Sequence, residues 1–278
     1  MLKRIKWYVL DIYELIRKPY MSTLPGNLAF FFVLSLIPLI TIILLILSIF
    51  NISVDSLISL IERFTPSDVS NILTSFISGK GFDGSVGFFN LVALVIAANG
   101  MYAITSVSDV LYDVKKSSEI NKRIKSFILL LIIVALFVFL LLVPIFGNQI
   151  LEFMKSNNFL SYIMNEVIFV FNLVKWPLSF LIVYFNIKLI YTISPSEKIK
   201  SENTSIGAFF TTILWIVVTS IFTYYLKYFA RYDILYGNLS SIIILMMWMY
   251  LLAYVFVLGM AINANRYHNL LKKDYTKN

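Results

Sequence analysis

Six long apolar runs dominate this 278-residue chain, and they constrain its fold more than any short motif does. A helix needs about 20 mostly apolar residues to cross a hydrocarbon core roughly 30 Å thick. In lipid, a helix also satisfies its own backbone hydrogen bonds. The sequence therefore predicts an all-α, polytopic membrane protein that forms a single integral membrane domain. Its six transmembrane helices are expected at residues 28–50, 86–112, 126–146, 167–193, 206–230 and 239–262.

The basic residues between the runs predict the orientation of the chain. Lys and Arg close to the ends of spans are retained on the cytoplasmic side. Of the 23 basic residues, 16 lie in the two terminal segments and the second and fourth gaps, whereas five lie in the other three gaps or, for Lys227, just before one of them. We therefore expect a cytoplasmic amphipathic segment at 1–27 and a cytoplasmic tail at 263–278. The first run is longer than the core of a cleavable signal peptide, so it should remain as a span.

Composition agrees with a membrane protein and argues against several other classes. The chain is 59% hydrophobic and 14% charged, with a mean hydropathy of +0.84, whereas about a quarter of residues are charged in soluble proteins. The net charge of +8 lies beside the spans, where it sets topology and attracts anionic lipids. We expect membrane lipids as partners, with anionic headgroups at the cytoplasmic basic segments, and no nucleic acid. The absence of cysteine excludes disulfides and thiolate metal sites.

Two segments outside the runs have amphipathic patterns. Apolar residues at helical spacing before the first span predict a helix that lies on the inner membrane surface or packs under the bundle, and both alternatives stay open. Pro25-Gly26 is expected to break the chain before the first span. Residues 51–85 predict two short extracytoplasmic helices separated by Thr65-Pro66, the second capped by Ser67 or Asp68. The glycines at 79–84 predict a hinge or a turn into the second span.

Catalytic motifs are absent from the sequence. The sole histidine, His268, lies in the polar tail, and there is neither an HExxH pattern nor a nucleophile elbow. Asp109 and Asp113 lie four residues apart at the end of the second span, where they could bind a divalent cation. Beside Lys115, however, a solvated and charge-balanced helix end is favoured. We expect no catalytic residue, no metal, no cofactor and no enzymatic activity.

Polar side chains inside the spans are the better functional signal, because burying them in lipid costs free energy. They are Asn99, Asn172, Lys175 and Asn186. The asparagines could join helices or line a cavity. Lys175 lies about 12 Å inside its run at about 1.5 Å per residue, and Pro177 weakens the helix next to it. Its ammonium could snorkel to the outer headgroups or face a water-filled cavity that attracts anions.

The chain also resembles a known family. Its segment AFFFVLSLIPL at residues 29–39 is similar to the stretch A-x-x-Y-x-x-L-S-L-x-P-L of the YihY/BrkB family of bacterial inner-membrane proteins. Later segments follow the family's ordered series of Pro, Gly, Trp, Tyr-Gly and a final Gly-to-Asn motif. The residues that carry the resemblance are Ser35, Pro38, Tyr112, Pro195, Gly207, Trp215, Tyr236, Gly237, Trp248, Tyr250, Gly259 and Asn263. Ala261 replaces a frequent glutamate, and Asn238 replaces a small residue.

The resemblance implies a multi-pass protein of the bacterial plasma membrane whose activity is poorly defined. Members are labelled ribonuclease BN, serum-resistance factor or suspected transporter of amphiphilic solutes. Our first hypothesis is a transporter or lipid-handling protein with a polar cavity, lined by Asn99, Asn172, Lys175 and Asn186 and open toward the outer leaflet. The alternative is a non-transporting scaffold or envelope-integrity protein. A cation antiporter would lack its buried carboxylate in mid-membrane, and a ribonuclease would lack a metal or acid-base constellation.

Overall fold

The computed structural model describes residues 12–49, 53–78, 87–115, 117–136 and 164–275, and all of its regular secondary structure there is helical. Four helices are long and apolar enough to cross a membrane. They span Tyr20–Ser48, Val92–Leu111, Ser201–Tyr228 and Ser240–Leu271. The all-helical membrane fold is therefore confirmed. The count of six spans and the cytoplasmic position of both termini stay predictions.

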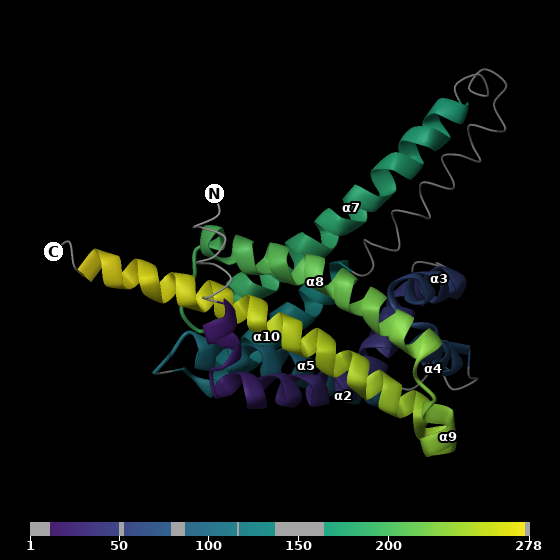
Figure 1. Cartoon of the computed structure of the whole chain (residues 1–278), viewed down its shortest axis with the longest axis horizontal. Helices are drawn as coiled ribbons and strands as arrows, with labels where there is room; N and C mark the ends of the chain where they lie inside the picture. The colour runs from purple at the N-terminus through teal and green to yellow at the C-terminus, as the bar shows by residue number, and fades with distance from the viewer. Residues whose placement is uncertain (1–11, 50–52, 79–86, 116, 137–163, 276–278) are drawn as a thin grey trace.

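The long helices pack in series. Helix α5 (Gly87–Leu111) packs on α2 (Tyr20–Ile49), α2 on α10 (Ser240–Tyr275), α10 on α8 (Ser201–Tyr228), and α8 on α7 (Met164–Ile193). The first half of α7 leans away from the other labelled helices (Figure 1). Another helix occupies residues 119–136 and contributes Leu129, Leu130 and Ile133 to the core. The predicted fourth span thus lies within α7, while the predicted third span is described only as far as residue 136.

The start of α2 differs from the sequence prediction. Helix α2 begins at Tyr20, directly after Pro19, and continues through Pro25, so the predicted break at Pro25-Gly26 is wrong. Met21 and Leu28, on either side of Pro25, are both buried in one core, and that packing outweighs the hydrogen bond lost at a helical proline. Residues 12–16 are helical, and Leu15 is buried in the same core. This favours a segment packed under the bundle.

The two helices predicted within 51–85 are confirmed as α3 (Val54–Phe64) and α4 (Ser67–Ser78). Ser53 caps α3 by accepting a hydrogen bond from the Asp55 amide. Leu57 and Ile61 of α3, together with Val69 and Leu73 of α4, are buried in a cluster that includes residues of α2 and α10. The pair therefore forms part of the core, and the glycine-rich segment 79–84 lies outside the described residues.

Different elements lie at the two ends of the bundle (Figure 1). At one end lie α3, α4 and the short α9 (Tyr232–Tyr236), near exposed aromatic residues such as Tyr228, Phe229 and Tyr236. Such residues are enriched at membrane–water interfaces. At the opposite end lie the start of α2, residues 112–115 and 117–118, the connection 194–200 and the end of α10. We call this second end the basic end, and it is the end predicted to face the cytoplasm.

Candidate functional site

The last turn of α5 determines where its two aspartates lie. The Val114 amide donates to the Asp109 carbonyl at 3.0 Å, and the Asp113 amide donates to the Val110 carbonyl at 3.3 Å. This double closure is a Schellman cap, in which the residue after the helix adopts a left-handed conformation. Asp113 does so, with a φ of 54°, and is exposed. The chain has left the helical repeat there, so the two aspartates do not share a face.

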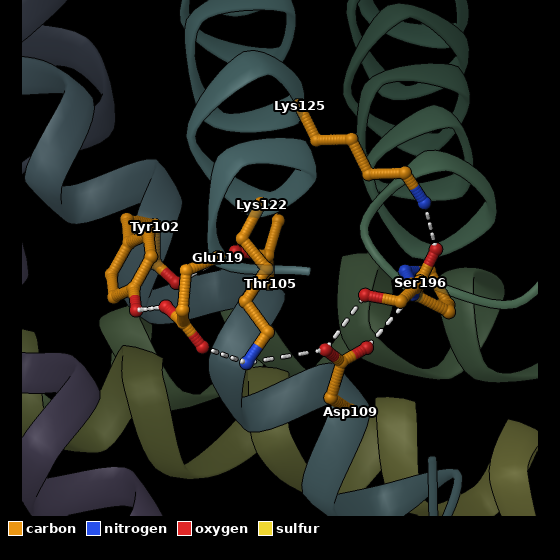
Figure 2. Close-up of polar contacts among 8 residues, drawn as sticks. Tyr102, Thr105, Asp109, Glu119, Lys122, Lys125 and Ser196 are labelled. Atoms are coloured by element: carbon orange, nitrogen blue, oxygen red, sulfur yellow. Dashed lines mark hydrogen bonds and ion pairs between the residues drawn. The ribbon is translucent and has the colours of Figure 1, made fainter. Parts of the chain in front are cut away.

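Asp109 is buried, with 5% of its surface exposed, and it connects three segments of the basic end. Its carboxylate accepts hydrogen bonds from the Ser196 amide at 2.8 Å and the Ser196 hydroxyl at 2.7 Å. The Lys122 ammonium lies 3.5 Å from the same carboxylate. Figure 2 shows these contacts between α5, the helix at 119–136 and the connection 194–200. We call Asp109, Lys122 and Ser196 the clasp, and the expected solvated helix end is wrong for Asp109.

The clasp continues toward the surface as a chain of polar contacts (Figure 2). Lys122 also lies 3.2 Å from Glu119, and the Tyr102 phenol donates to the same glutamate. The Tyr102 hydrogen bond, followed by that from Lys122, holds the pKa of the Glu119 carboxyl below its usual range. Burial acts to lower the pKa of Lys122, but the carboxylates of Glu119 and Asp109 together outweigh it and raise that pKa. The chain of contacts is therefore charged at neutral pH.

A second cation lies beside the clasp. The Lys125 ammonium donates to the Pro195 carbonyl, one residue before Ser196. Burial lowers the pKa of Lys125. Next to it is an open pocket of about 280 Å³. The connection 194–200 is thus held to the helix at 119–136 by a lysine and to α5 by an aspartate.

The predicted cavity residues lie on two different helices. Asn99, half-buried on α5, accepts a hydrogen bond from the Arg123 guanidinium at 2.6 Å, and that guanidinium also covers the Tyr102 ring at 4.5 Å. Asn186 is half-buried on α7. The backbones of Asn172 and Lys175 belong to α7, but their side chains lie outside the described part. That these four line one cavity therefore stays a prediction.

The family-motif residues of the second half bring α8 and α10 close together. A Cβ added to Gly207 or Gly259 would lie within 3.0 Å of the other glycine's carbonyl oxygen, so only glycine allows this approach. The buried Asn263 side chain accepts from the Gly207 amide at 2.8 Å and donates to the Thr204 carbonyl at 3.1 Å. Asn263 of α10 is thereby bonded to two backbone groups of α8.

The remaining motif residues also pack or turn the chain. Gly237 has a φ of 51° between α9 and α10, a conformation that residues with a Cβ rarely adopt. Trp248 is buried and donates to Thr219 at 3.3 Å. Ser35 donates to the Phe31 carbonyl within α2, which also contains Pro38. The Tyr112 ring is buried against the Tyr267 ring, and Tyr250 is exposed. The Pro195 carbonyl accepts a hydrogen bond from the Lys125 ammonium.

Lys122, Lys125 and Ser196 were not singled out from the sequence. The two lysines counted only toward topology, and the partners Asp109 and Ser196 are 87 residues apart in the chain. A carboxylate three residues from the end of a predicted span was the available signal, since such a group needs a partner when it is buried. Within the described segments, no group of three His, Cys, Asp or Glu residues could hold a metal ion. The expectation of a protein without enzymatic activity stays a prediction.

The long apolar helices and the buried polar contacts define a helical, multi-pass membrane protein. Residues 13–277 match the family described as virulence factor BrkB, and the chain belongs to that family. It is 32% identical over 248 residues to the ribonuclease-like protein YfkH of Bacillus subtilis, covering 86% of this chain and 87% of that protein. No solved structure matches the chain.

Two further relatives carry only membrane-protein names. A UPF0761 membrane protein of Glaesserella parasuis is 26% identical over 71% of this chain and 68% of its own length. Another from Haemophilus influenzae is 25% identical over 72% of this chain and 71% of its own length. The chain is therefore a multi-pass bacterial membrane protein, and the word ribonuclease describes one relative's name only.

Proposed function

We propose that this protein moves or presents an amphiphilic solute at the membrane, and that the clasp closes its basic end. The observation that carries the proposal is the buried Asp109 carboxylate, shared between Lys122 and Ser196. It joins three segments that must separate if a polar headgroup is to enter between them. An anionic or zwitterionic lipid has the chemistry that such an entrance requires.

The free energy needed to bury the charges of the clasp favours a switching role over a purely structural one. Taking an ion pair out of water is expensive, and apolar side chains of similar volume often stabilise a fold equally well. In the clasp, the side chains of Asp109 and Lys122 are only 6% and 12% exposed. We infer that the pair switches between the closed arrangement seen here and one that is opened to water and headgroups. A scaffold that moves no solute would not require the open arrangement.

Helix α7 would line the outer half of the route that the solute takes through the protein. Lys175 would attract the anionic headgroup, with Asn99, Asn172 and Asn186 as further polar contacts. The proline that follows, Pro177, lies inside α7 and leaves one helical carbonyl unpaired. Lys175→Ala should abolish movement of the solute without loss of folded protein. Unchanged movement would remove Lys175 from the mechanism.

The proposal is tested by following a fluorescent phospholipid between leaflets of vesicles that contain the purified protein. Wild-type protein should speed the transfer relative to protein-free vesicles. Asp109→Asn, which removes the charge that holds Lys122, should speed it several-fold further. Glu119→Gln is the matched control, because it removes the same charge from Lys122 at an exposed position and should leave the rate nearly unchanged.

Two outcomes would contradict the proposal. Transfer at the protein-free rate for wild type and all variants would exclude lipid movement and favour the scaffold alternative. Equal rates for Asp109→Asn and Glu119→Gln would show that the clasp does not control access.

A further inference from the structure

A pocket with several hydrogen-bond donors in its lining opens at the basic end beside the clasp. Its volume is about 280 Å³, close to the lower end of small-molecule sites at roughly 300 Å³. It is lined by Ser117, Ser118, Asn121, Ile124, Lys125 and Ser196. The lining therefore offers one cation, three hydroxyls and one amide, with no carboxylate. This donor-rich composition suits an anion the size of a lipid headgroup.

Lys125 is the only charged group in that lining. It makes no direct ion pair with a described residue, although the Asp109 carboxylate attracts it from farther away. Its ammonium donates to a neutral acceptor, the Pro195 carbonyl. The ion pairs of the described residues at this end involve Lys122 with Asp109 and Glu119, and none involves Lys125. The nearest carboxylate of the clasp is already countered by Lys122. A half-buried ammonium in this position is stabilised by an incoming anion.

The start of the helix at 119–136 adds to the positive potential of the pocket. The Lys122 amide donates to the Ser118 carbonyl, so the helix begins just after Ser118, and its first amides have no acceptor within the helix. The partial positive charge of a helix start favours anions. Ser117, Ser118 and Asn121 belong to the lining, so this helix start lies at the pocket wall.

An apolar stripe leads away from the pocket along the same helix. Ile120 is 72% exposed, Ile124 is 53% exposed, and both Ile128 and Leu131 are also exposed. The spacing of four, four and three residues places them on one face of a helix. Ile124 belongs to both the stripe and the pocket lining. An acyl chain could therefore lie along the stripe while its headgroup occupies the pocket.

We propose that this pocket binds the phosphate group of an anionic phospholipid, with Lys125 as the cation and the hydroxyls of Ser117, Ser118 and Ser196 as donors. The Ser196 hydroxyl now donates to Asp109, so a bound phosphate competes with the clasp for it. Phosphate binding is inferred from the pocket alone, and it does not require that the protein moves a solute. Phosphate binding without lipid transfer would overturn only the proposed function.

Binding is measured by calorimetric titration of purified protein in detergent with short-chain phosphatidic acid. Lys125→Gln should weaken binding about tenfold, the loss of one charge-assisted hydrogen bond. Lys198→Gln is the matched control, because it removes an exposed lysine two residues from Ser196 that is outside the pocket lining, and it should bind as wild type does. Asn121→Asp, which adds a negative charge at an exposed position of the lining, should weaken binding without affecting the fold.

Two competitors identify the source of the phosphate. Short-chain phosphatidylcholine should compete weakly, since its headgroup carries a balancing positive charge, and inorganic phosphate alone should not compete at equal concentration. Competition by inorganic phosphate as strong as by phosphatidic acid would overturn the lipid assignment in favour of a soluble phosphate. Unchanged affinity in both Lys125→Gln and Asn121→Asp, or an equal loss in Lys198→Gln, would overturn the site itself.

Discussion

The helices α8 and α10 approach each other closely at Gly207 and Gly259, and this contact makes a stability prediction possible. In Gly259→Ala, the new Cβ would lie 2.9 Å from the Gly207 carbonyl oxygen and nearer still to the Thr211 hydroxyl, whereas ordinary contact begins at 3.4 Å. The helices must therefore part by about 0.5 Å or more. A gap of that size forfeits about a quarter of each dispersion contact across the crossing. We expect a loss of about 2 kcal/mol, within the usual range for overpacking.

Gly207→Ala should be worse, because its nearest obstacle is the backbone carbonyl of Gly259, which no side-chain change can remove. We expect a loss of about 3 kcal/mol, which lowers the Tm by about 6–12 °C for a chain of this size. Gly26→Ala is the matched control, since that glycine is also helical and its added Cβ would meet nothing within 4 Å. It should melt at or slightly above the wild-type temperature.

A double-variant cycle separates crowding from other effects. Thr211→Ala removes the hydroxyl nearest the new Cβ, while the Tyr191 hydroxyl still donates to the Phe256 carbonyl at 2.6 Å. It should rescue part of the Gly259→Ala loss, whereas Thr211→Ser keeps the hydroxyl and should not. Thermal unfolding in detergent, followed by tryptophan fluorescence, measures all these variants. Melting of Gly207→Ala within about 2 °C of wild type, or equal rescue by Ala and Ser, would refute the reasoning.

Further predictions concern one residue each. Asn263→Ala should lower the free energy of unfolding by about 2–4 kcal/mol, because it removes both hydrogen bonds to α8; an unchanged Tm would show that those bonds are dispensable. Gly237→Ala should cost about 1–3 kcal/mol for its left-handed backbone, with Gly26→Ala again as control. The lowered pKa of Glu119 contributes stability above the ordinary carboxyl pKa, and that stability is lost as the pH falls through the lowered value. The Tm difference between wild type and Glu119→Gln should therefore shrink on acidification, and a difference independent of pH would contradict the charge pairing with Lys122.

The sequence predicted those elements whose signals are local. The break between α3 and α4 follows from Thr65-Pro66. Ser67 and Asp68, predicted as possible caps, are the first residues of α4, and the serine that caps α3, Ser53, was not predicted. The start of α2 was missed, because the local signal of Pro25 is outweighed by the burial of Met21 and Leu28. That burial depends on contacts with other helices, which periodicity does not show.

The sequence indicated only part of the candidate site, because its contacts also join distant segments of the chain. The sequence singles out Asp109 as a carboxylate near the end of a span, but it predicts a solvated helix end beside Lys115 and not a buried contact. Its partner Ser196 lies on a connection far along the chain, and the Schellman cap that turns Asp113 away depends on an aspartate adopting a left-handed conformation. The motif residues Gly259 and Asn263 were recognised by resemblance, while their role in joining α8 to α10 required the packing.

The central claim, that the clasp controls access at the basic end, is tested most directly by locking it. The chain has no cysteine, so a double variant Asp109→Cys and Ser196→Cys carries two unique thiols on the segments that the clasp joins. A short, reducible bis-thiosulfonate reagent would bridge them, with mass spectrometry confirming the bridge. We predict that lipid transfer in vesicles falls to the protein-free rate when the bridge is present and returns on reduction. The same transfer rate before and after reduction would contradict the account.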